Sequence, residues 1–329
     1  MNHATLGRTG LPVSRLCLGT MTFGNQCDEP TSHAILDHAV DNGITFIDTA
    51  DMYPATGPDE VGLTEEIIGR WMKGRRHEVV LATKFWGPTG PAPWNRGASR
   101  RHIMEAVEAS LRRLGTDTID LYQIHFPDQV SPTDEILQAF DDLVRQGKVH
   151  YVGCSNFPAW VLARSIGRSE ALGLVRYDCV QPRYNLLFRS FERDLFPLCE
   201  TDEIAVIPYN PLAGGLLTGK HKREAPDSGS RFTIAGGQGD RYMERYWQDQ
   251  LHDVVEAIRP LAAESGRSMA ELAVGWVLAN PTVTSPIVGA TRPDQLDDAI
   301  AAEASPLDDD LKTALDELTH HLRVVEADR

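Results

Sequence analysis

The chain has 329 residues, a formal net charge of -15, and 42% apolar and 24% charged residues. This length fits one large α/β barrel or two average domains, and the composition is that of a globular protein with a sizeable core. A diffuse acidic surface repels phosphate backbones and so argues against nucleic acid as a partner, although a small anion can still bind at a local cluster of basic groups.

Short apolar and β-branched runs alternate with amphipathic helical patterns along most of the chain. A small hairpin is expected at residues 3–12, where Gly7 to Gly10 lie between short apolar stretches. Most of the strand-like runs are continuously apolar, as expected for strands that are covered on both faces. The eight predicted strands are residues 13–19, 44–48, 79–84, 118–125, 149–154, 178–181, 204–209 and 284–289.

Several helices between these runs have recognisable start and stop signals. A helix predicted at Arg100–Leu114 begins after Ser99, a good N-cap, and ends at Gly115, which suits the left-handed position after the last turn. The next helix begins at Pro132 and ends at Gly147. Further helices are predicted at residues 31–42, 293–302 and 308–322.

Eight strands that alternate with helices, without a linker or a shift in composition, predict a (β/α)8 TIM barrel. We expect a single domain over residues 1–329, and a doubly wound open sheet is the alternative fold. Residues 214–246, after the seventh strand, break the alternation and are rich in Gly, Lys, Arg and Asp. A structureless segment of that length in a compact domain is usually functional or mobile. We therefore predict a long flap that covers a ligand.

Four residues of different chemistry lie at or just after the ends of three predicted strands. Asp48 ends the second strand, and Tyr53 lies in the loop that follows it. Lys84 ends the third strand, and His125 ends the fourth. Each residue alone has an ordinary explanation as a turn former, a surface phenol, a snorkelling amine or a structural imidazole. Their coincidence at the carboxyl ends of barrel strands, where barrel enzymes carry their chemistry, favours an active site.

An acid, a phenol, an amine and an imidazole at one face suit proton transfer. A nearby cation favours the phenolate, so Lys84 is expected to lower the pKa of Tyr53, which is about 10 in a free side chain. Asp48 would balance the charge of Lys84, and a neutral His125 would orient the substrate oxygen. The hypothesis is that Tyr53 protonates a carbonyl oxygen while a hydride reaches the carbon.

Longer segments around these four residues resemble the aldo-keto reductase family. The similar segments are residues 48–53, 82–86, 122–128, 152–157, 180–185, 208–220 and 286–291. They cover nearly the whole chain in order, and they are most similar to the bacterial branch that also resembles potassium-channel beta subunits. The resemblance implies Asp48, Tyr53, Lys84 and His125 as the catalytic set, NADPH as the cofactor and a carbonyl compound as the substrate.

The resemblance also implies where the cofactor binds, since the sequence has no Gly-x-Gly-x-x-Gly motif after a strand. Ser155, Asn156 and Gln181 would hydrogen-bond the carboxamide, and Tyr209 would stack on the nicotinamide ring. The residues that would surround the pyrophosphate are Leu212, Gly214, Gly219, Lys220 and Arg231. The glycines let the backbone approach the phosphates, and the two cations balance their charge.

After the eighth strand, a helix N-terminus with Arg292 is a plausible site for a 2′-phosphate, which favours NADPH over NADH. Two residues depart from the family pattern near the adenine: Ala299 replaces the common Asn, and Asp298 replaces the usual Glu. A third departure is Pro54, where Gly usually follows the tyrosine, and it should stiffen the loop of Tyr53. The other implied contacts are Gly19, Thr20, Met21, Asp48, Asn210, Gly289, Thr291, Gln295 and Asp298.

The substrate is predicted only as a class. Aromatic and apolar residues in the loops after the first, third and fourth strands suit carbonyl compounds with apolar substituents. These residues are Met21, Phe23, Trp86, Trp94 and Phe126. The oligomeric state stays open, because an apolar stripe such as that of helix 308–322 more often faces its own barrel than a partner.

Three other interpretations are weaker. Residues 214–220 match the first part of a phosphate-binding P-loop, but His221 follows where a Ser or Thr should bind magnesium. His320 and His321 are adjacent on a helix and point about 100° apart, so no metal site is predicted. A non-enzymatic module that senses nicotinamide nucleotides remains the alternative function, and steady turnover of NADPH would exclude it.

The expected location is the cytoplasm. The first residues contain no apolar stretch of signal-peptide length, and no run approaches the roughly 20 apolar residues of a membrane span. The five cysteines form no Cys-x-x-Cys pair, and Cys17, Cys154 and Cys179 lie in strand-like runs, where a small buried thiol is common. An odd, scattered number of cysteines is typical of a reducing compartment.

Overall fold

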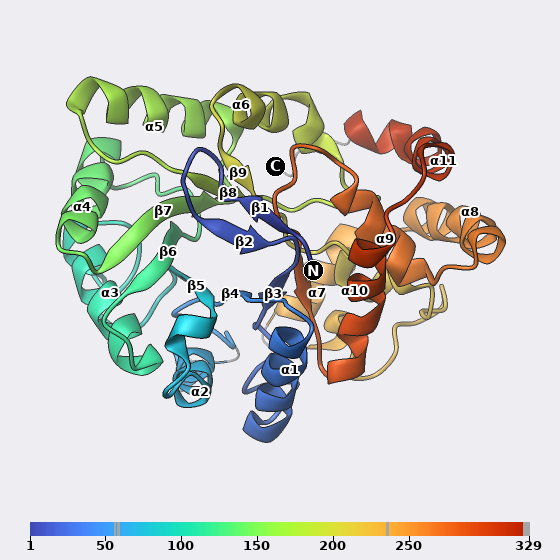
Figure 1. Ribbon diagram of the computed structural model, residues 1–329, viewed down its shortest axis with the longest axis horizontal. Helices are drawn as coiled ribbons and strands as arrows, with labels where there is room; N and C mark the ends of the chain where they lie inside the picture. Colours follow the sequence, from blue (N-terminus) through green and yellow to red (C-terminus); the bar gives the residue numbers. More distant parts are fainter. Residues whose placement is uncertain (56, 58–59, 235–236, 325–329) are drawn as a thin grey trace.

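The structure is a computed structural model, and it describes residues 1–55, 57, 60–234 and 237–324. Its centre is a sheet of eight parallel strands in the order β10-β3-β4-β5-β6-β7-β8-β9 (Figure 1). Parallel bridges from Val206 to Val283 and from Tyr209 to Ile287 join the two edges of this sheet. The predicted (β/α)8 barrel is therefore confirmed. Its strands are β3 Cys17–Gly19, β4 Phe46–Asp48, β5 Val80–Phe85, β6 Ile119–Ile124, β7 Val149–Ser155, β8 Cys179–Gln181, β9 Ala205–Val206 and β10 Ile287–Gly289.

One predicted strand is wrong at its boundary. The run 13–19 divides in two, because β2 (Pro12–Ser14) pairs antiparallel with β1 (His3–Thr5) and only β3 joins the barrel. The Ser14 hydroxyl donates a hydrogen bond to the backbone oxygen of Leu16 at 2.6 Å and accepts two backbone N–H groups from the start of β4. These bonds fix a bend inside an apolar run that reads as continuous in the sequence.

The predicted hairpin is present and covers the amino-terminal end of the barrel. Its turn contains Gly7 at φ 56°, a left-handed conformation that favours glycine. A Cβ atom on Gly7 would lie 2.6 Å from the backbone oxygen of Glu203 and 2.8 Å from that of Asp178, beside the starts of β9 and β8. The hairpin therefore packs its backbone directly against the strand entrances and leaves the opposite end of the barrel for ligands.

Helices surround the barrel (Figure 1). The start of the helix at Arg100–Leu114 is confirmed, because the Ser99 side chain accepts the N–H of His102, and the helix ends at Gly115 with φ 64°. The helices of the described residues are α1 Glu29–Asp41, α2 Leu63–Trp71, α3 Arg100–Leu114, α4 Thr133–Arg145, α5 Ala159–Leu172, α6 Leu195–Thr201, α7 Gln238–Tyr246, α8 Asp249–Ser265, α9 Met269–Leu278, α10 Asp297–Ala304 and α11 Asp309–Thr319.

Several helix boundaries differ from the prediction, and the helix predicted at 293–302 begins as the 3₁₀-helix Pro293–Leu296 and continues as α10 to Ala304. The first helix, α1, begins at Glu29 rather than at residue 31, because the Asp28 carboxylate accepts the N–H of Thr31 and makes Asp28 the N-cap. The last α-helix, α11, ends at Thr319, and the chain continues as a 3₁₀-helix, His320–Val324. No helix of the described ranges is long and apolar enough to cross a bilayer.

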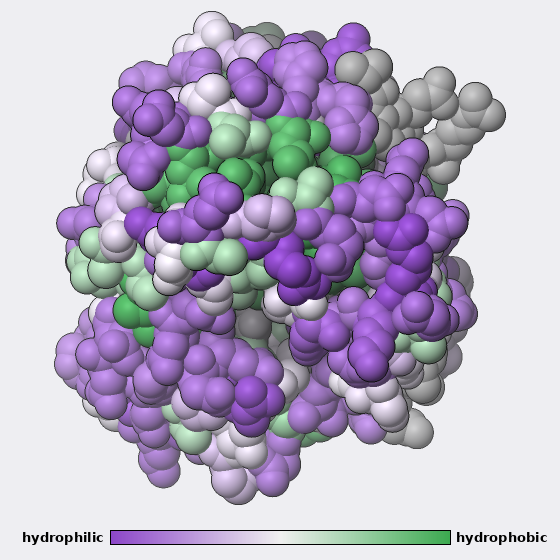
Figure 2. All heavy atoms as spheres, turned by 90° about the vertical axis from the view of Figure 1, so that its right-hand side faces the viewer, coloured by the Kyte–Doolittle hydropathy of each residue, from purple (hydrophilic) through white to green (hydrophobic). Residues whose placement is uncertain are grey.

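The core has two layers. Side chains such as Cys17, Phe46 and Leu121 fill the barrel interior, and a larger cluster lies between the strands and the helices. All five cysteines are buried free thiols, as expected for the three that lie in strands. The apolar stripe of α11 packs on this core through the fully buried Leu315. On that side of the molecule the surface is mostly hydrophilic, with a hydrophobic area recessed among hydrophilic side chains (Figure 2).

The flap lies across the carboxyl ends of the strands, but the expectation that it lacks regular structure is wrong. It contains the 3₁₀-helices Ala213–Thr218 and Arg231–Thr233 and the helix α7, while residues 235–236 lie outside the described residues. The Gln26 amide donates to the backbone oxygen of Gly229 at 3.0 Å, which holds the flap against the loop after β3.

Candidate active site

Asp48 and Lys84 form a buried ion pair at the carboxyl ends of β4 and β5. The Nζ of Lys84 donates to Oδ2 of Asp48 at 2.6 Å and to the backbone oxygen of Thr49 at 2.8 Å, and the two side chains are 4% and 0% exposed. The amides of Gln123 and Gln181 donate to Oδ1 of Asp48 at 3.0 and 2.9 Å. Burying two charges is costly unless hydrogen bonds satisfy them, and these donors meet that condition.

The alternation of side chains along β5 explains the position of Lys84. Ala82 and Lys84 point to one face of the strand, and Thr83 points to the other, where its hydroxyl donates to Glu65 of α2 at 2.6 Å. Lys84 is therefore directed into the barrel mouth. The same alternation along β6 and the residue after it places Gln123 on the same face as His125. Sequence reasoning missed Gln123, although its position two residues before His125 was a signal for it.

Tyr53 lies beside the ion pair. The Nζ of Lys84 is 5.3 Å from the centre of the Tyr53 ring. Desolvation raises the pKa of Tyr53, the charge of Lys84 acts against this increase, and Asp48 adds to it. The expectation that Lys84 lowers the pKa below its ordinary value is therefore wrong, because burial outweighs the cation. Tyr53 keeps its proton at neutral pH, and this is the form that a proton donor needs.

The protonation states of Lys84 and His125 follow from the same surroundings. Burial lowers the pKa of Lys84, but the charges of Asp48 and Tyr53 outweigh it and raise the pKa overall. Burial lowers the pKa of His125 well below its ordinary value, and Lys84 and Arg241 add to the decrease. The centres of the Tyr53 and His125 rings are 5.9 Å apart, and Nδ1 of His125 is buried without a hydrogen-bond partner. The site therefore contains an ammonium group beside a neutral imidazole.

Four residues of the implied nicotinamide site are linked to this centre. The Tyr209 hydroxyl donates to Oδ1 of Asn156 at 2.8 Å, and Nδ2 of Asn156 donates to the backbone oxygen of His125 at 3.0 Å. The Ser155 hydroxyl donates to the backbone oxygen of Gln181 at 2.9 Å. Because Gln181 also binds Asp48, the structure brings Ser155, Asn156, Gln181 and Tyr209 together with the catalytic candidates.

The loop after β9 contains two adjacent glycines in the left-handed region and a buried amide without a hydrogen-bond partner among the described residues. Gly214 and Gly215 have φ values of 71° and 104°, and a Cβ on Gly214 would lie 2.7 Å from the Tyr242 ring. Nδ2 of Asn210 is buried without a hydrogen-bond partner, so it is a donor that a ligand could satisfy. These observations fit a phosphate group. Of the other residues implied here, Leu212 and Gly219 are half-buried and Lys220 is exposed.

The first strand and the last strand meet beside the catalytic candidates. Gly19 pairs with Gly289, and a Cβ on Gly19 would lie 2.6 Å from the Ile287 side chain. Both the backbone N–H and the hydroxyl of Thr20 donate to the backbone oxygen of Asp48, at 3.1 and 3.0 Å. These two hydrogen bonds fix the end of β4.

The residues implied for the adenosine end lie farther out, after β10. Arg292 and Asp294 form an exposed ion pair at 3.1 Å, with side chains 62% and 63% exposed. The Gln295 side chain accepts the backbone N–H of Thr291 at 2.8 Å. The Asp298 carboxylate accepts the Ser268 hydroxyl at 2.8 Å. Arg292 therefore has an accessible guanidinium group, whereas part of the Asp298 carboxylate is already engaged.

The candidate substrate side chains do not share one location. The Trp86 and Phe126 rings are 5.2 Å apart, and Phe126 stacks on His125 at 4.9 Å. The sulfur of Met21 lies 3.7 Å from Nη1 of Arg231. Trp94 is 47% exposed, and Phe23 is completely buried in the core. Trp86 and Phe126 are thus the aromatic pair beside the centre, and Phe23 has no surface for a ligand.

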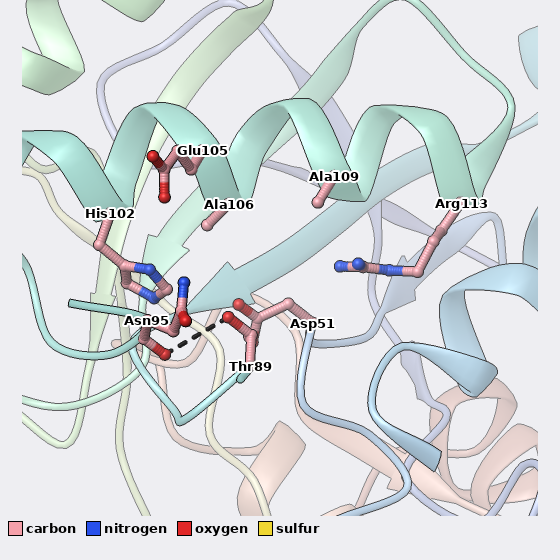
Figure 3. A pocket seen from close by; sticks show the side chains of 8 residues that line it. All are labelled: Asp51, Thr89, Asn95, His102, Glu105, Ala106, Ala109 and Arg113. Atoms are coloured by element: carbon pink, nitrogen blue, oxygen red, sulfur yellow. Dashed lines mark hydrogen bonds between the residues drawn. The ribbon is translucent and has the colours of Figure 1, made fainter. Parts of the chain in front are cut away.

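A separate cavity of about 170 Å³ lies outside the barrel wall, between the loops after β4 and β5 and helix α3 (Figure 3). Both carboxylate oxygens of Asp51 are buried here without a hydrogen-bond partner. Burial raises the pKa of Asp51 well above its ordinary value, and the charge of Glu65 adds to the increase. Figure 3 shows the Arg113 and His102 side chains pointing into the same space from α3. A polar cavity of this size is typical of ordered water.

The closed barrel and the buried ion pair at its carboxyl end define an α/β-barrel protein with its site at the face that barrel enzymes use. The chain belongs to the aldo/keto reductase family, whose sequence model matches residues 15–320. Membership supports oxidoreductase activity on carbonyl compounds and a nicotinamide cofactor. Among the described residues, no group of three or more His, Cys, Asp or Glu side chains is arranged to hold a metal ion.

Individual relatives are similar over nearly their full length. The uncharacterized oxidoreductase YrpG of Bacillus subtilis is 41% identical over 327 residues, which cover 97% of this chain and 96% of the relative. A probable voltage-gated potassium channel subunit beta of Arabidopsis thaliana is 36% identical over 308 residues, with 92% and 91% covered. The versiconal hemiacetal acetate reductase of Aspergillus parasiticus is 33% identical over 333 residues, with 92% of each chain covered.

Proposed function

We propose that the protein reduces aldehydes or ketones to alcohols with NADPH. The observation that carries the proposal is the buried Asp48–Lys84 pair, with the Lys84 ammonium 5.3 Å from the centre of the Tyr53 ring and the centre of the His125 ring 5.9 Å from it. A phenol that keeps its proton, next to a fixed cation, is suited to donate that proton when negative charge develops on a substrate oxygen.

The roles of the four side chains follow from this geometry. A bound nicotinamide nucleotide supplies the hydride to the carbonyl carbon. Tyr53 donates its phenolic proton to the carbonyl oxygen, and the Lys84 ammonium stabilises the phenolate that remains. Asp48 holds Lys84 through the 2.6 Å hydrogen bond. Neutral His125 donates an N–H to the carbonyl oxygen and orients it before the proton is transferred.

The cofactor-binding proposal follows the positions of the implied residues. Ser155, Asn156 and Gln181 bind the carboxamide, and the Tyr209 ring packs on the nicotinamide. The pyrophosphate lies along the positive-φ glycines and the unpartnered Asn210 amide, which support the assignment. Leu212, Gly219, Lys220 and Arg231 complete this part. The 2′-phosphate binds the exposed Arg292, with Thr291, Gln295 and Asp298 nearby, and Gly19, Thr20, Met21, Asp48 and Gly289 border the nicotinamide end.

The substrate part of the proposal is narrower than the sequence suggested. Trp86 and Phe126 line the pocket beside His125, and Met21 and Trp94 border it. The buried Phe23 is left out because its side chain is in the core. An aromatic wall of this kind favours carbonyl compounds with an apolar or aromatic substituent.

The test is NADPH consumption with a panel of aldehydes and ketones, each also measured with NADH. We expect steady turnover with at least the aromatic aldehydes and a preference for NADPH. Three of the relatives are described as potassium channel beta subunits, which favours a nucleotide-sensing module as the second candidate function. Tight NADPH binding without turnover of any carbonyl compound would support that second function and contradict the first.

A further inference from the structure

Helix α7 of the flap presents one face to the barrel mouth. Residues three, four and seven positions apart share a helix face, so Gln238, Arg241, Tyr242 and Arg245 lie together. The Gln238 amide donates to the backbone oxygen of Ala55 at 2.9 Å, in the loop that carries Tyr53. The Tyr242 hydroxyl lies 3.5 Å from Oδ1 of Asn210, beside the proposed pyrophosphate loop. These two contacts direct the shared face across the mouth.

The charges on α7 are segregated. Asp240 and Glu244 are exposed and lie about 120° or more around the helix from Gln238, which contacts the loop of Tyr53, and Arg241 lies between Gln238 and Glu244. The two arginines lie on the Gln238 side of the helix, where Arg245 is half-buried and Arg241 is exposed. The helix therefore carries its positive charges nearer to the mouth than its negative charges, in a chain with a net charge of -15.

The charges of Arg241 and Arg245 influence the pKa values of two groups of the candidate site. Arg241 contributes to the lowered pKa of His125, although burial is the larger cause. Arg245 opposes the increase that burial causes in the pKa of Tyr209. Arg241 lies one turn after Gln238 on the face that contacts the loop of Tyr53, and the Arg245 side chain hydrogen-bonds Tyr209, the proposed nicotinamide platform.

The two guanidinium groups have no acidic partner within the part of the chain that the structure describes. Other arginines close in sequence do have acidic partners: Arg223 pairs with Asp253, and Arg259 pairs with Glu256. Cations left without a carboxylate at a mouth lined by aromatic rings attract and position an anionic ligand.

We propose that the mouth selects carbonyl substrates that carry an anionic group, with Arg241 as the principal contact and Arg245 as the second. The inference rests on the proposed reductase function and names its substrate class. The anionic group is a carboxylate or a phosphate, since a guanidinium fork binds either one. Arg231 is not part of this contact, because it is assigned to the cofactor and lies against Met21.

The experiment compares kcat/KM for 4-carboxybenzaldehyde and its methyl ester, which have nearly the same size and different charge. Glyceraldehyde 3-phosphate and glyceraldehyde form the matched pair for the phosphate. We expect the anionic member of at least one pair to be favoured by the native protein, and the pair that shows it identifies the anion. In Arg241→Ala that preference should fall about tenfold, mainly through KM of the anionic member, while kcat/KM of the neutral member changes much less.

Two variants control for indirect effects. Arg241→Lys keeps the charge and should retain much of the preference, and Arg223→Ala removes a flap arginine that is paired with Asp253 and should change nothing. Equal preference in native protein and Arg241→Ala would overturn the inference while the turnover of neutral aldehydes still supports the reductase.

A binding measurement distinguishes failure of the proposed anion site from failure of the reductase proposal. Calorimetry with 4-carboxybenzaldehyde and with glyceraldehyde 3-phosphate on the NADP⁺-loaded protein needs no turnover, and we expect binding of at least one of them that Arg241→Ala weakens about tenfold. If no carbonyl compound is reduced but this difference in binding is present, the reductase proposal fails and the anion site stands. If Arg241→Ala binds both anionic aldehydes as the native protein does, the anion site is refuted.

Discussion

The site has a buried centre around Asp48 and Lys84 and an exposed rim that includes Arg292, and the two differ in how their charged groups are paired. In the centre, Asp48 accepts hydrogen bonds from Lys84, Gln123 and Gln181, and all four side chains are buried. On the rim, Arg292 is 62% exposed, and among the described residues its ion-pair partner is the equally exposed Asp294. The fold thus completes the polar contacts of the centre by itself, whereas it leaves cations of the rim accessible to a ligand.

This difference has a physical reason. A buried charge without partners destabilises the fold, so the centre must satisfy its charges before any ligand arrives. An exposed arginine costs little, because water solvates it and a surface ion pair contributes less than about 1 kcal/mol. The proposed catalytic groups therefore lie where the fold must pair its charges, and the groups proposed to select the ligand lie where charged side chains can stay exposed. Substitutions in the centre and on the rim should have different consequences.

The largest expected effect is in the centre. Tyr53→Phe removes the proton donor and should lower kcat by about 10² to 10⁴, the usual contribution of general acid catalysis. Because the hydroxyl is not assigned to the cofactor, the Kd for NADPH should be unchanged. Stopped-flow measurement of aldehyde reduction and fluorescence titration of NADPH check the two parts. Retained turnover would remove Tyr53 from its role, and lost binding would indicate a structural defect.

The next effect concerns stability. Lys84→Met leaves the buried Asp48 carboxylate without its cation and should lower the free energy of unfolding by about 3–5 kcal/mol. The matched control is Lys148→Met, because Lys148 pairs with Glu108 at the surface, where the side chains are 32% and 43% exposed. That control should cost less than about 1 kcal/mol. Denaturant unfolding of both variants measures the difference, and equal costs would mean that the centre is no better organised than the surface.

On the rim, Arg292→Ala should change ligand affinity without a change in stability. The loss of a charge-assisted contact to the 2′-phosphate should weaken NADPH by about 10- to 100-fold and leave NADH unchanged. Titration with both nucleotides checks the prediction. If both nucleotides are weakened equally, Arg292 does not distinguish them, and a fall in melting temperature would place Arg292 among the structural residues.

The smallest effect concerns Asp51, which is buried like the centre but whose carboxylate oxygens have no hydrogen-bond partner in the part of the chain that the structure describes. Its raised pKa means that the folded protein holds this proton more tightly than the unfolded chain does. Stability is therefore lost as the pH rises above the ordinary carboxyl value of about 3.9. Asp51→Asn should raise the melting temperature at pH 7.5 by a few degrees, at roughly 2–4 °C per kcal/mol, and by less at pH 4.5.

Calorimetric melting at the two pH values checks this prediction. Asp253→Asn is the control, since Asp253 is 69% exposed and its substitution should have little effect at either pH. A shift for Asp51→Asn that is the same at both pH values would show that the carboxyl group does not titrate as its burial requires.

Much of the centre could be predicted from the sequence because strand ends and side-chain parity are local properties. Asp48, Lys84 and His125 were placed at one face by the apolar runs that precede them. The direction of the Tyr53 pKa was not predictable, because desolvation depends on packing from segments distant in the chain. Gln123 was overlooked because a glutamine within an apolar strand has no distinctive pattern until its partner Asp48 is known.

The rim was less predictable for similar reasons. Helix α7 was expected to be irregular because residues 214–246 are rich in Gly, Lys, Arg and Asp. Its structure depends on contacts such as that of Gln238 with the loop of Tyr53. The break after Ser14 in the first predicted strand depends on hydrogen bonds to residues 30 positions later. Local patterns therefore identified the catalytic candidates, and tertiary contacts determined which groups remain open to a ligand.

The most direct test of the account is a crystal structure of the protein with NADP⁺ and an unreactive carbonyl ligand. The account predicts that the carbonyl oxygen lies within about 3 Å of both the Tyr53 hydroxyl and the His125 ring, with the nicotinamide against Tyr209. A ligand bound elsewhere, or a carbonyl oxygen directed away from Tyr53, would contradict it.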